Sequence, residues 1–246
     1  MKFQMASAEI IYPRNEESSI RLLRALEKFG MVLALHGIPV NLVSKRGLAK
    51  LEEIEPSKKH SMAEYIENWT TWIEPVRDVH GNTLPYDEKV TLRKALNHYD
   101  LEMHPDMWAT IMPNHMLEVY GKEMLQIYRS LNFFTVCGYS LLDLMTHEWY
   151  VLWERPKIIL DNLLATAQKY STNYIPVSEF VVPRHLLREI WDTGLTEPFE
   201  PRATLVEFQF IGTLVDHETK KVSGFCCTST GKVVAHGQDA VAIDFL

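Results

Sequence analysis

The sequence lacks the short motifs by which several large enzyme classes are recognised. Neither GxGxxG nor GxxxxGKS/T occurs, so no phosphate-binding loop of either kind is present. The GxSxG elbow of serine hydrolases is missing, because "CGYSLLD" has no second glycine. His147 precedes Glu148, but Val151 stands where an HExxH zinc protease needs its second histidine. Nucleotide hydrolysis, serine hydrolysis and zinc proteolysis therefore have no support in the sequence.

Cysteine is scarce, with three residues in a chain of 246. Cys226 and Cys227 are adjacent, a spacing that rarely closes a disulfide, and no CxxC pair exists to hold a structural zinc ion. We therefore expect reduced thiols, no metal site and a cytoplasmic location.

A positive charge excess and a long apolar run are also missing. The formal net charge is −7, so no general field attracts nucleic-acid phosphates or anionic lipid. The stretch "MVLALHGIPVNLV" is interrupted by Gly37 and Pro39 and is shorter than the roughly 18 apolar residues of a membrane span. The first residues contain no apolar core of signal-peptide length. We expect neither nucleic acid nor a membrane as a partner.

The composition is that of a globular protein, and the first hundred residues have mainly helical patterns. Apolar residues repeat at three-residue spacing from Ile20 to Phe29, which predicts an amphipathic helix ending at Gly30. The run 31–47 is predicted to be strand-like, and residues 48–75 return to helix with a break at Pro56. The composition of residues 78–89 predicts a loop.

Two-residue alternation dominates the last third of the chain and predicts antiparallel strands. Three strands are expected, with turns at "DHETKK" and "STGK". In the first strand Phe208 and Phe210 are expected on one buried face with Val206, and Glu207 on the other. In the second, Cys226 and Cys227 point to opposite faces.

The middle of the chain leaves one alternative open. "HMLEVYGKEMLQIYRS" fits either two short strands or one helix, and its periodicity slightly favours the helix. Residues 157–171 predict a long helix, and "IPVSEFVVPRHLLREIWDTG" a loop followed by a helix. The predicted fold class is α+β, with a mainly helical region at 1–105 and a region with an antiparallel sheet at 106–246.

The stretch "LQIYRSLNFFTVCGYSLLDL" resembles the PAS sensor-domain family. Phe133 lies five residues before Gly138, a Gly-Tyr-Ser turn follows, and Asp143 and Leu144 occupy the place of the family's acidic-Leu pair. The residues have local roles too, because Gly138 permits a positive φ and Ser140 can cap a helix with Asp143 at its N3 position. The surrounding order of hairpin, connecting helix and C-terminal antiparallel strands extends the resemblance over about residues 108–246.

The chain also departs from the PAS pattern. Ser130 stands where the family commonly has asparagine, Cys137 replaces a threonine, and the segment 182–201 is a long insertion. The flavin-adduct signature is absent, so the resemblance does not imply a light-sensing flavin. It implies a sensory module for signal transduction that binds a small ligand and relays occupancy through flanking helices to a protein partner or within a homodimer.

Seven residues are candidate ligand-binding positions under this resemblance. His147 and His185 are candidate axial ligands if the cofactor is haem. Trp149 and Trp153, at i and i+4, would stack on a planar organic ligand from one helical face. The other candidates are the strand residues Phe208, Phe210 and Cys226. The cofactor itself is not identified by the sequence.

An enzyme of unrecognised type is the alternative function. It would use histidine and carboxylate as acid and base in a cleft, and His147, Glu148 and Glu154 are its first candidates. Their spacing selects no particular reaction.

Overall fold

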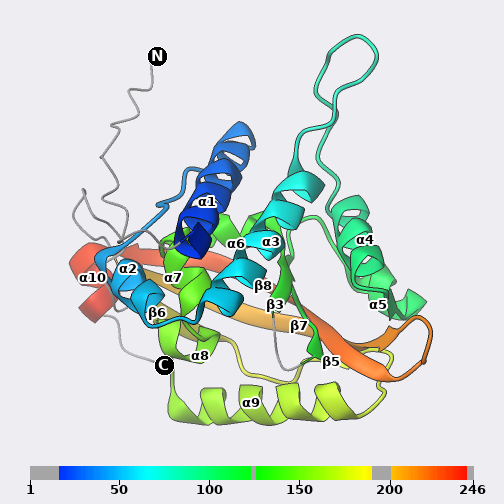
Figure 1. Ribbon diagram of the computed structural model, residues 1–246. Coiled ribbons are helices and arrows are strands. Elements are labelled where there is room, and N and C mark those ends of the chain that lie inside the picture. Colours follow the sequence, from blue (N-terminus) through cyan, green and yellow to red (C-terminus); the bar gives the residue numbers. More distant parts are fainter. Residues whose placement is uncertain (1–16, 123–125, 190–200, 243–246) are drawn as a thin grey trace.

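The computed structural model describes residues 17–122, 126–189 and 201–242. It confirms the α+β class: helices α1 to α4 precede a curled antiparallel sheet (Figure 1). The strands run in the order β3-β2-β8-β7-β6-β4, and the short strands β1 and β5 also pair with β7. None of the described helices is both long and apolar enough to cross a membrane.

The helical region contains α1 (Glu17–Leu35), α2 (Lys45–Glu52), α3 (Pro56–Ile73) and α4 (Glu88–His98). The expected end of α1 at Gly30 is wrong, and so is the strand predicted at 31–47. Residues 31–35 continue α1, residues 36–44 form no helix or strand, and residues 45–47 begin α2. Gly30 serves packing instead, because a Cβ there would collide with the side chain of Leu42. The apolar face of α1 is buried and packs against α3.

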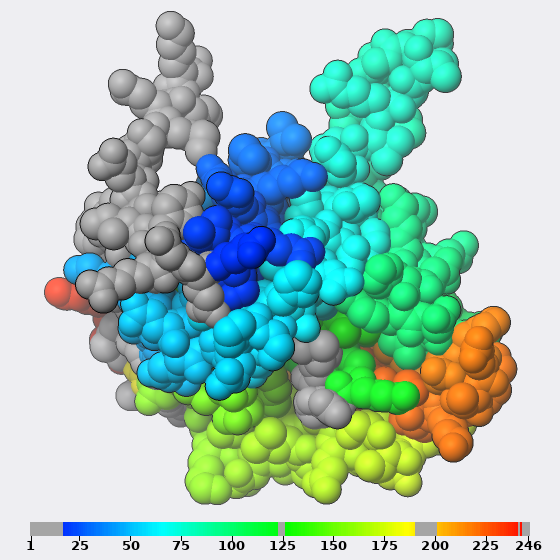
Figure 2. Space-filling model, in the orientation of Figure 1, coloured from blue at the N-terminus to red at the C-terminus, as the bar shows by residue number. Residues whose placement is uncertain are grey.

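The loop predicted at 78–89 is confirmed over residues 78–87, ahead of α4. Together with the preceding residues it projects from the body as a narrow arm, held by an isolated bridge between Arg77 and Thr83 (Figures 1 and 2). Val79 at its end is 95% exposed.

The middle segment forms two strands, β2 (Met116–Tyr120) and β3 (Gln126–Arg129). The helix that periodicity favoured is therefore wrong, and the strand alternative holds. The sheet continues with β1 (Leu101–Met103), β4 (Trp153–Glu154), β5 (Ser178–Glu179) and β6 (His185–Glu189). Within residues 175–194 the sequence predicted a loop followed by a helix. That helix is wrong for residues 185–189, which form β6, and residues 190–194 lie outside the described residues.

The longest strands are β7 (Arg202–Asp216) and β8 (Val222–His236), which form one hairpin. The predicted turn at "DHETKK" is confirmed, but the one at "STGK" is wrong, because β8 continues through it with Gly231 opposite Val206. A Cβ at Gly231 would lie 2.8 Å from Cε of Met116, so the glycine there permits close packing. Of the expected third strand, residues 233–236 are the end of β8 and residues 237–242 form the helix α10 (Gly237–Ala242).

The two faces of the sheet are covered by different helices. The predicted helix α9 (Lys157–Thr172) is confirmed and runs along one face, while the N-terminal helices cover the other (Figure 1). The short helices α5 (Pro105–Thr110), α6 (Leu131–Val136), α7 (Leu141–Thr146) and α8 (Trp149–Leu152) complete the fold. One hydrophobic cluster includes residues from both sides of the boundary expected at 105/106.

The predicted cap at Ser140 is confirmed. Its Oγ accepts from the backbone N–H of Asp143 at 3.1 Å. The Asp143 carboxylate also accepts from Ser44 Oγ at 2.7 Å, and Ser44 is itself the N-cap of α2. This single buried carboxylate therefore joins the starts of two helices that are distant in sequence.

Candidate functional site

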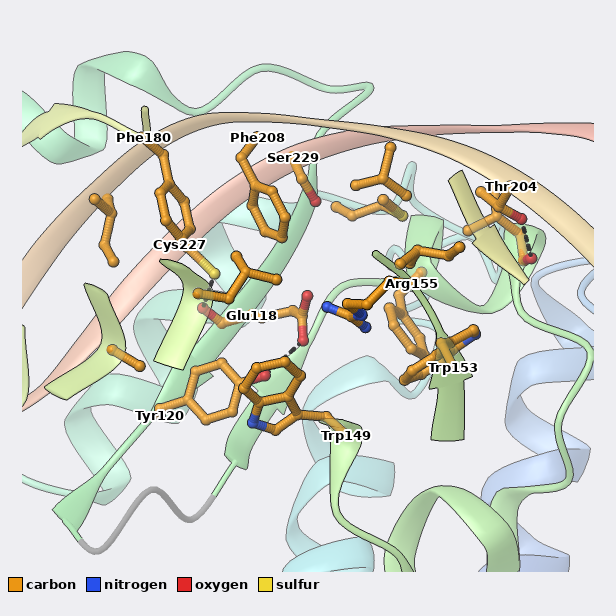
Figure 3. A pocket seen from close by; sticks show the side chains of 18 of the residues that line it. Glu118, Tyr120, Trp149, Trp153, Arg155, Phe180, Thr204, Phe208, Cys227 and Ser229 are labelled. Carbon is orange, nitrogen blue, oxygen red and sulfur yellow. Dashed lines mark hydrogen bonds between the residues drawn. The ribbon is translucent and has the colours of Figure 1, made fainter. Parts of the chain in front are cut away.

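A cavity of about 80 Å³ lies between the α9 face of the sheet and the helices α6 and α8 (Figure 3). Its walls are mainly apolar and aromatic, with a few polar groups, as is typical of small-molecule sites. The lining residues are Met116, Glu118, Tyr120, Phe133, Val136, Cys137, Trp149, Trp153, Arg155, Leu163, Ala167, Phe180, Leu187, Thr204, Val206, Phe208, Ile211, Phe225, Cys227 and Ser229.

Strand alternation selects which sheet residues reach the cavity. Glu118 and Tyr120 on β2 face it, together with Phe225 and Cys227 on β8. The opposite face carries Cys226, which is fully buried in the cluster under the N-terminal helices. The predicted alternation of the two cysteines is thus present, and the cysteine that reaches the cavity is Cys227.

A bulge in β7 separates two phenylalanines that the sequence placed on one face. Phe208 is opposite Ser229 and Phe210 is opposite Thr228, so Gln209 is an extra residue between them. Phe208 lines the cavity, whereas Phe210 packs against the cluster on the other face. The expectation of one shared face is therefore wrong, and Ile211 resumes the cavity side.

The two tryptophans both line the cavity, although no single helix carries them. Trp149 begins α8, and Trp153 follows it as the first residue of β4. The Trp153 ring lies edge-on to Phe133, with centroids 5.9 Å apart, and to Tyr139 at 5.6 Å. The helical stacking face expected from their spacing is therefore wrong, but both indoles still meet the same cavity.

Neither candidate histidine lines the cavity. His147 is at the end of α7, where its Nε2 accepts from Nε of Arg46 at 3.1 Å. His185 stacks on Phe208 at 6.0 Å and donates from Nδ1 to the carbonyl of Pro183 at 2.8 Å. Burial lowers the pKa of both imidazoles, which favours their neutral forms. The position of the two rings and the cavity volume do not fit a haem macrocycle.

Two charged residues of the cavity were not among the candidates from the sequence, and the first is Arg155. Its Cζ lies 5.2 Å from the ring centroid of Trp149, a cation–π contact. Its Nε is buried and has no hydrogen-bond partner in the described parts of the chain. Burial lowers the pKa of the guanidinium from 12.5 to about 10, opposed by the charge of Glu118, so the group stays protonated at neutral pH.

Glu118 is the second missed residue. Its Oε2 accepts from Tyr120 Oη at 2.8 Å and from Gln126 Nε2 at 2.7 Å. Figure 3 shows the carboxylate and the guanidinium of Arg155 directed toward the same part of the cavity. One signal in the sequence could have identified Glu118. It is a charged residue within a short apolar run, and it is two residues from Tyr120, so in a strand both side chains lie on the same face.

Gly138 has a different role from the one expected. It is not among the described glycines with positive φ. Its N–H donates to Oε1 of Glu189 at 2.5 Å, and a Cβ would lie 2.7 Å from Oε2 of that carboxylate. Glu189 is 2% exposed, and burial raises its pKa to about 7. The glycine therefore permits the close approach of a buried carboxylate.

The acid–base candidates of the enzyme alternative do not converge on the cavity. Glu148 is the N-cap residue of α8, and Glu154 pairs with Arg188 at 2.8 Å near the surface. His147 lies beside Arg46, outside the lining. Among residues 17–122, 126–189 and 201–242, no three His, Cys, Asp or Glu side chains gather as a metal-ligand set.

Comparisons of the chain with protein-family models, with curated proteins and with solved structures give no match.

Proposed function

We propose that this chain is a PAS-like sensory module that binds a small organic molecule in the cavity and relays its occupancy to the N-terminal helices. The observation that carries the proposal is the preformed cavity, with aromatic walls and the charged groups Arg155 and Glu118 inside it. Apolar cavities with a few placed polar groups are the usual form of small-ligand sites.

The order of elements around the cavity supports the PAS resemblance. The β2–β3 hairpin precedes the capped Gly138-Tyr139-Ser140 turn, α9 connects, and β6, β7 and β8 follow as antiparallel neighbours. Phe133, which occupies the place of the family's aromatic residue, lies in α6 and lines the cavity.

A chain of aromatic contacts supports the relay. Phe133 lines the cavity, and its ring lies 5.5 Å from that of Phe134. Phe134 in turn contacts Phe29 of α1 at 5.7 Å and Trp69 of α3 at 5.5 Å. A ligand that moves Phe133 therefore changes the packing of two N-terminal helices, because close-packed rings transmit displacement.

The proposal assigns the readout to a partner protein or to a second copy of the chain. The apolar face of α1 is buried against α3, so a homodimer would form through another surface. We also assign the protein to the cytoplasm, in accord with three free and buried cysteines.

Filling the cavity tests the proposal. Ala167 on α9 lines the cavity, whereas Ala165 on the same helix is exposed, so Ala167→Leu and Ala165→Leu are a matched pair. Small molecules released from each purified protein are identified by mass spectrometry. We expect one species from the wild type and from Ala165→Leu that is lost from Ala167→Leu. Equal recovery of every species from all three proteins contradicts the proposal.

A further inference from the structure

We propose that the ligand of this cavity is a small organic monoanion, a carboxylic acid with a short apolar body, whose carboxylate pairs with Arg155. The inference rests on the proposed ligand-binding function and adds the chemical class of the ligand. It follows from three features: an incompletely satisfied guanidinium in the cavity wall, the balance of buried charges, and the size and polarity of the remaining space.

Arg155 has hydrogen-bonding capacity that the protein leaves unused. Its side chain contacts the face of Trp149, and no ion pair to a carboxylate is formed in the described parts of the chain. A guanidinium offers five N–H donors in a planar fork that matches a carboxylate. Buried donors without acceptors are unfavourable, so a ligand that supplies a carboxylate gains a charge-assisted pair.

The charges around the cavity leave a positive excess. Arg129 is 5% exposed, and its Cζ lies 4.6 Å from the ring centroid of Phe133, a lining residue. It is opposite Glu118 in the β2–β3 register, so both side chains leave the same face of the hairpin. Among the residues that line the cavity, Glu118 is thus the one carboxylate, against the guanidinium of Arg155 in the lining and that of Arg129 beside it. A ligand with a single negative charge balances this set.

The neighbouring acidic group does not change this balance. Glu189 accepts from the backbone N–H of Arg202 at 3.2 Å, and the positive charge of Arg202 acts on it there. Neither Glu189 nor Arg202 is among the residues that line the cavity. A dianion is disfavoured because Glu118 would repel its second charge.

The remaining space limits the body of the ligand. A volume of about 80 Å³ is several times the roughly 10–15 Å³ that a cavity needs to hold one water molecule. Leu163, Ala167 and Phe180 supply apolar walls there. A short aliphatic chain or one aromatic ring fits this space, because it buries apolar area without leaving polar groups unpaired.

Matched acids and amides test the charge requirement. Hexanoate with hexanamide, and phenylacetate with phenylacetamide, are titrated calorimetrically into wild-type protein at low salt. We expect each acid to bind at least about tenfold more tightly than its amide. In Arg155→Met the ratio falls to about one. The control Arg93→Met, at an exposed arginine whose Cζ lies 5.4 Å from the Trp108 ring centroid, keeps the wild-type ratio.

The lysine variant keeps the test valid if Arg155→Met fails to fold. Arg155→Lys retains the charge without the planar fork, and we expect it to keep a preference for the acid that is smaller than in wild type. Equal binding of acids and amides to wild type overturns the ligand class while leaving the ligand-binding function intact. Failure of all four probes to bind, together with identical small-molecule content in Ala167→Leu and wild type, overturns both. An acid preference unchanged in Arg155→Met overturns the role of Arg155.

Discussion

The guanidinium of Arg155 lies over the indole of Trp149, with Cζ 5.2 Å from the ring centroid, inside a cavity bounded by the sheet, α6, α8 and α9. The contact holds a positive charge where water is largely excluded. Such a charge is costly to a folded protein unless an anion or a hydrogen-bond acceptor meets it. This arrangement is the basis of the ligand class proposed above, and it has its own consequence for stability.

Replacing Arg155 by methionine is expected to stabilise the ligand-free protein. Burial lowers the pKa of the guanidinium from 12.5 to about 10, so keeping it charged in the folded protein costs about 3 kcal/mol of stability at neutral pH. The substitution also removes the cation–π contact with Trp149, which cancels about 1 kcal/mol of this gain. We expect the free energy of unfolding to rise by about 2 kcal/mol in urea titrations of protein refolded without ligand. Arg93→Met is the control and should change it little. A large loss of stability in Arg155→Met would show that the charge is satisfied within the fold.

The buried carboxyl of Glu189 predicts a pH dependence of stability. Burial raises its pKa from 4.5 to about 7, so the folded protein holds this proton more tightly than the unfolded chain. The resulting stability is fully present below pH 4.5 and is lost as the pH rises through 7. Glu189→Gln should reduce the decline in unfolding free energy between about pH 5 and about pH 8 by about 3 kcal/mol. The exposed Glu207→Gln provides the control, and equal slopes in both variants would refute the assignment.

The buried carboxylate of Asp143 joins the starts of α2 and α7, so a small substitution beside it is expected to have a large effect on stability. Ser44 accepts from the N–H of Gly47 at 2.8 Å and donates to Asp143 at 2.7 Å, with no exposure to solvent. Ser44→Ala removes a cap and leaves a buried carboxylate with one donor fewer, at an expected cost of about 2 kcal/mol. Thr135→Ala, at an exposed hydroxyl, should cost less than about 0.5 kcal/mol. Similar midpoints in chemical denaturation for both variants would contradict this reasoning.

The aromatic relay predicts that binding and signalling can be separated. Phe134 does not line the cavity, but its ring connects Phe133 to Trp69. With hexanoate as the probe, wild-type α3 should become more protected against amide hydrogen exchange. In Phe134→Leu we expect affinity to change less than about threefold while this protection change is lost. Phe210→Leu, on the opposite face from the cavity, should behave as wild type. An intact α3 response in Phe134→Leu would exclude this route.

Local patterns in the sequence predicted the elements that local energetics determine. The helix at 157–171, the helices before and after Pro56 and the Ser140 cap were all predicted, because propensity, breakers and capping act within a few residues. The predictions that were wrong concern residues whose role is set by contact with a residue distant in the sequence. Gly30 and Gly231 were read as terminators, but their role is to admit Leu42 and Met116.

The cavity was predictable only in part for the same reason. Period-two reasoning identified the face that carries Phe208, but one bulged residue moved Phe210 to the other side. Trp149 and Trp153 were predicted as candidates, yet they meet through the packing of α8 and β4 rather than through one helix. Arg155 lies just past β4 in a segment with no periodic pattern, so only the fold brings it beside Trp149 and Glu118.

The most direct test of the account is the indole N–H spectrum of the protein during titration with phenylacetate. Trp149 and Trp153 line the cavity and Trp108 does not, so each spectrum contains its own control. We predict saturable shifts of the first two resonances, a smaller shift of Trp69 through the aromatic chain, and none of Trp108. Unchanged resonances for Trp149 and Trp153 at saturating probe would contradict binding in this cavity.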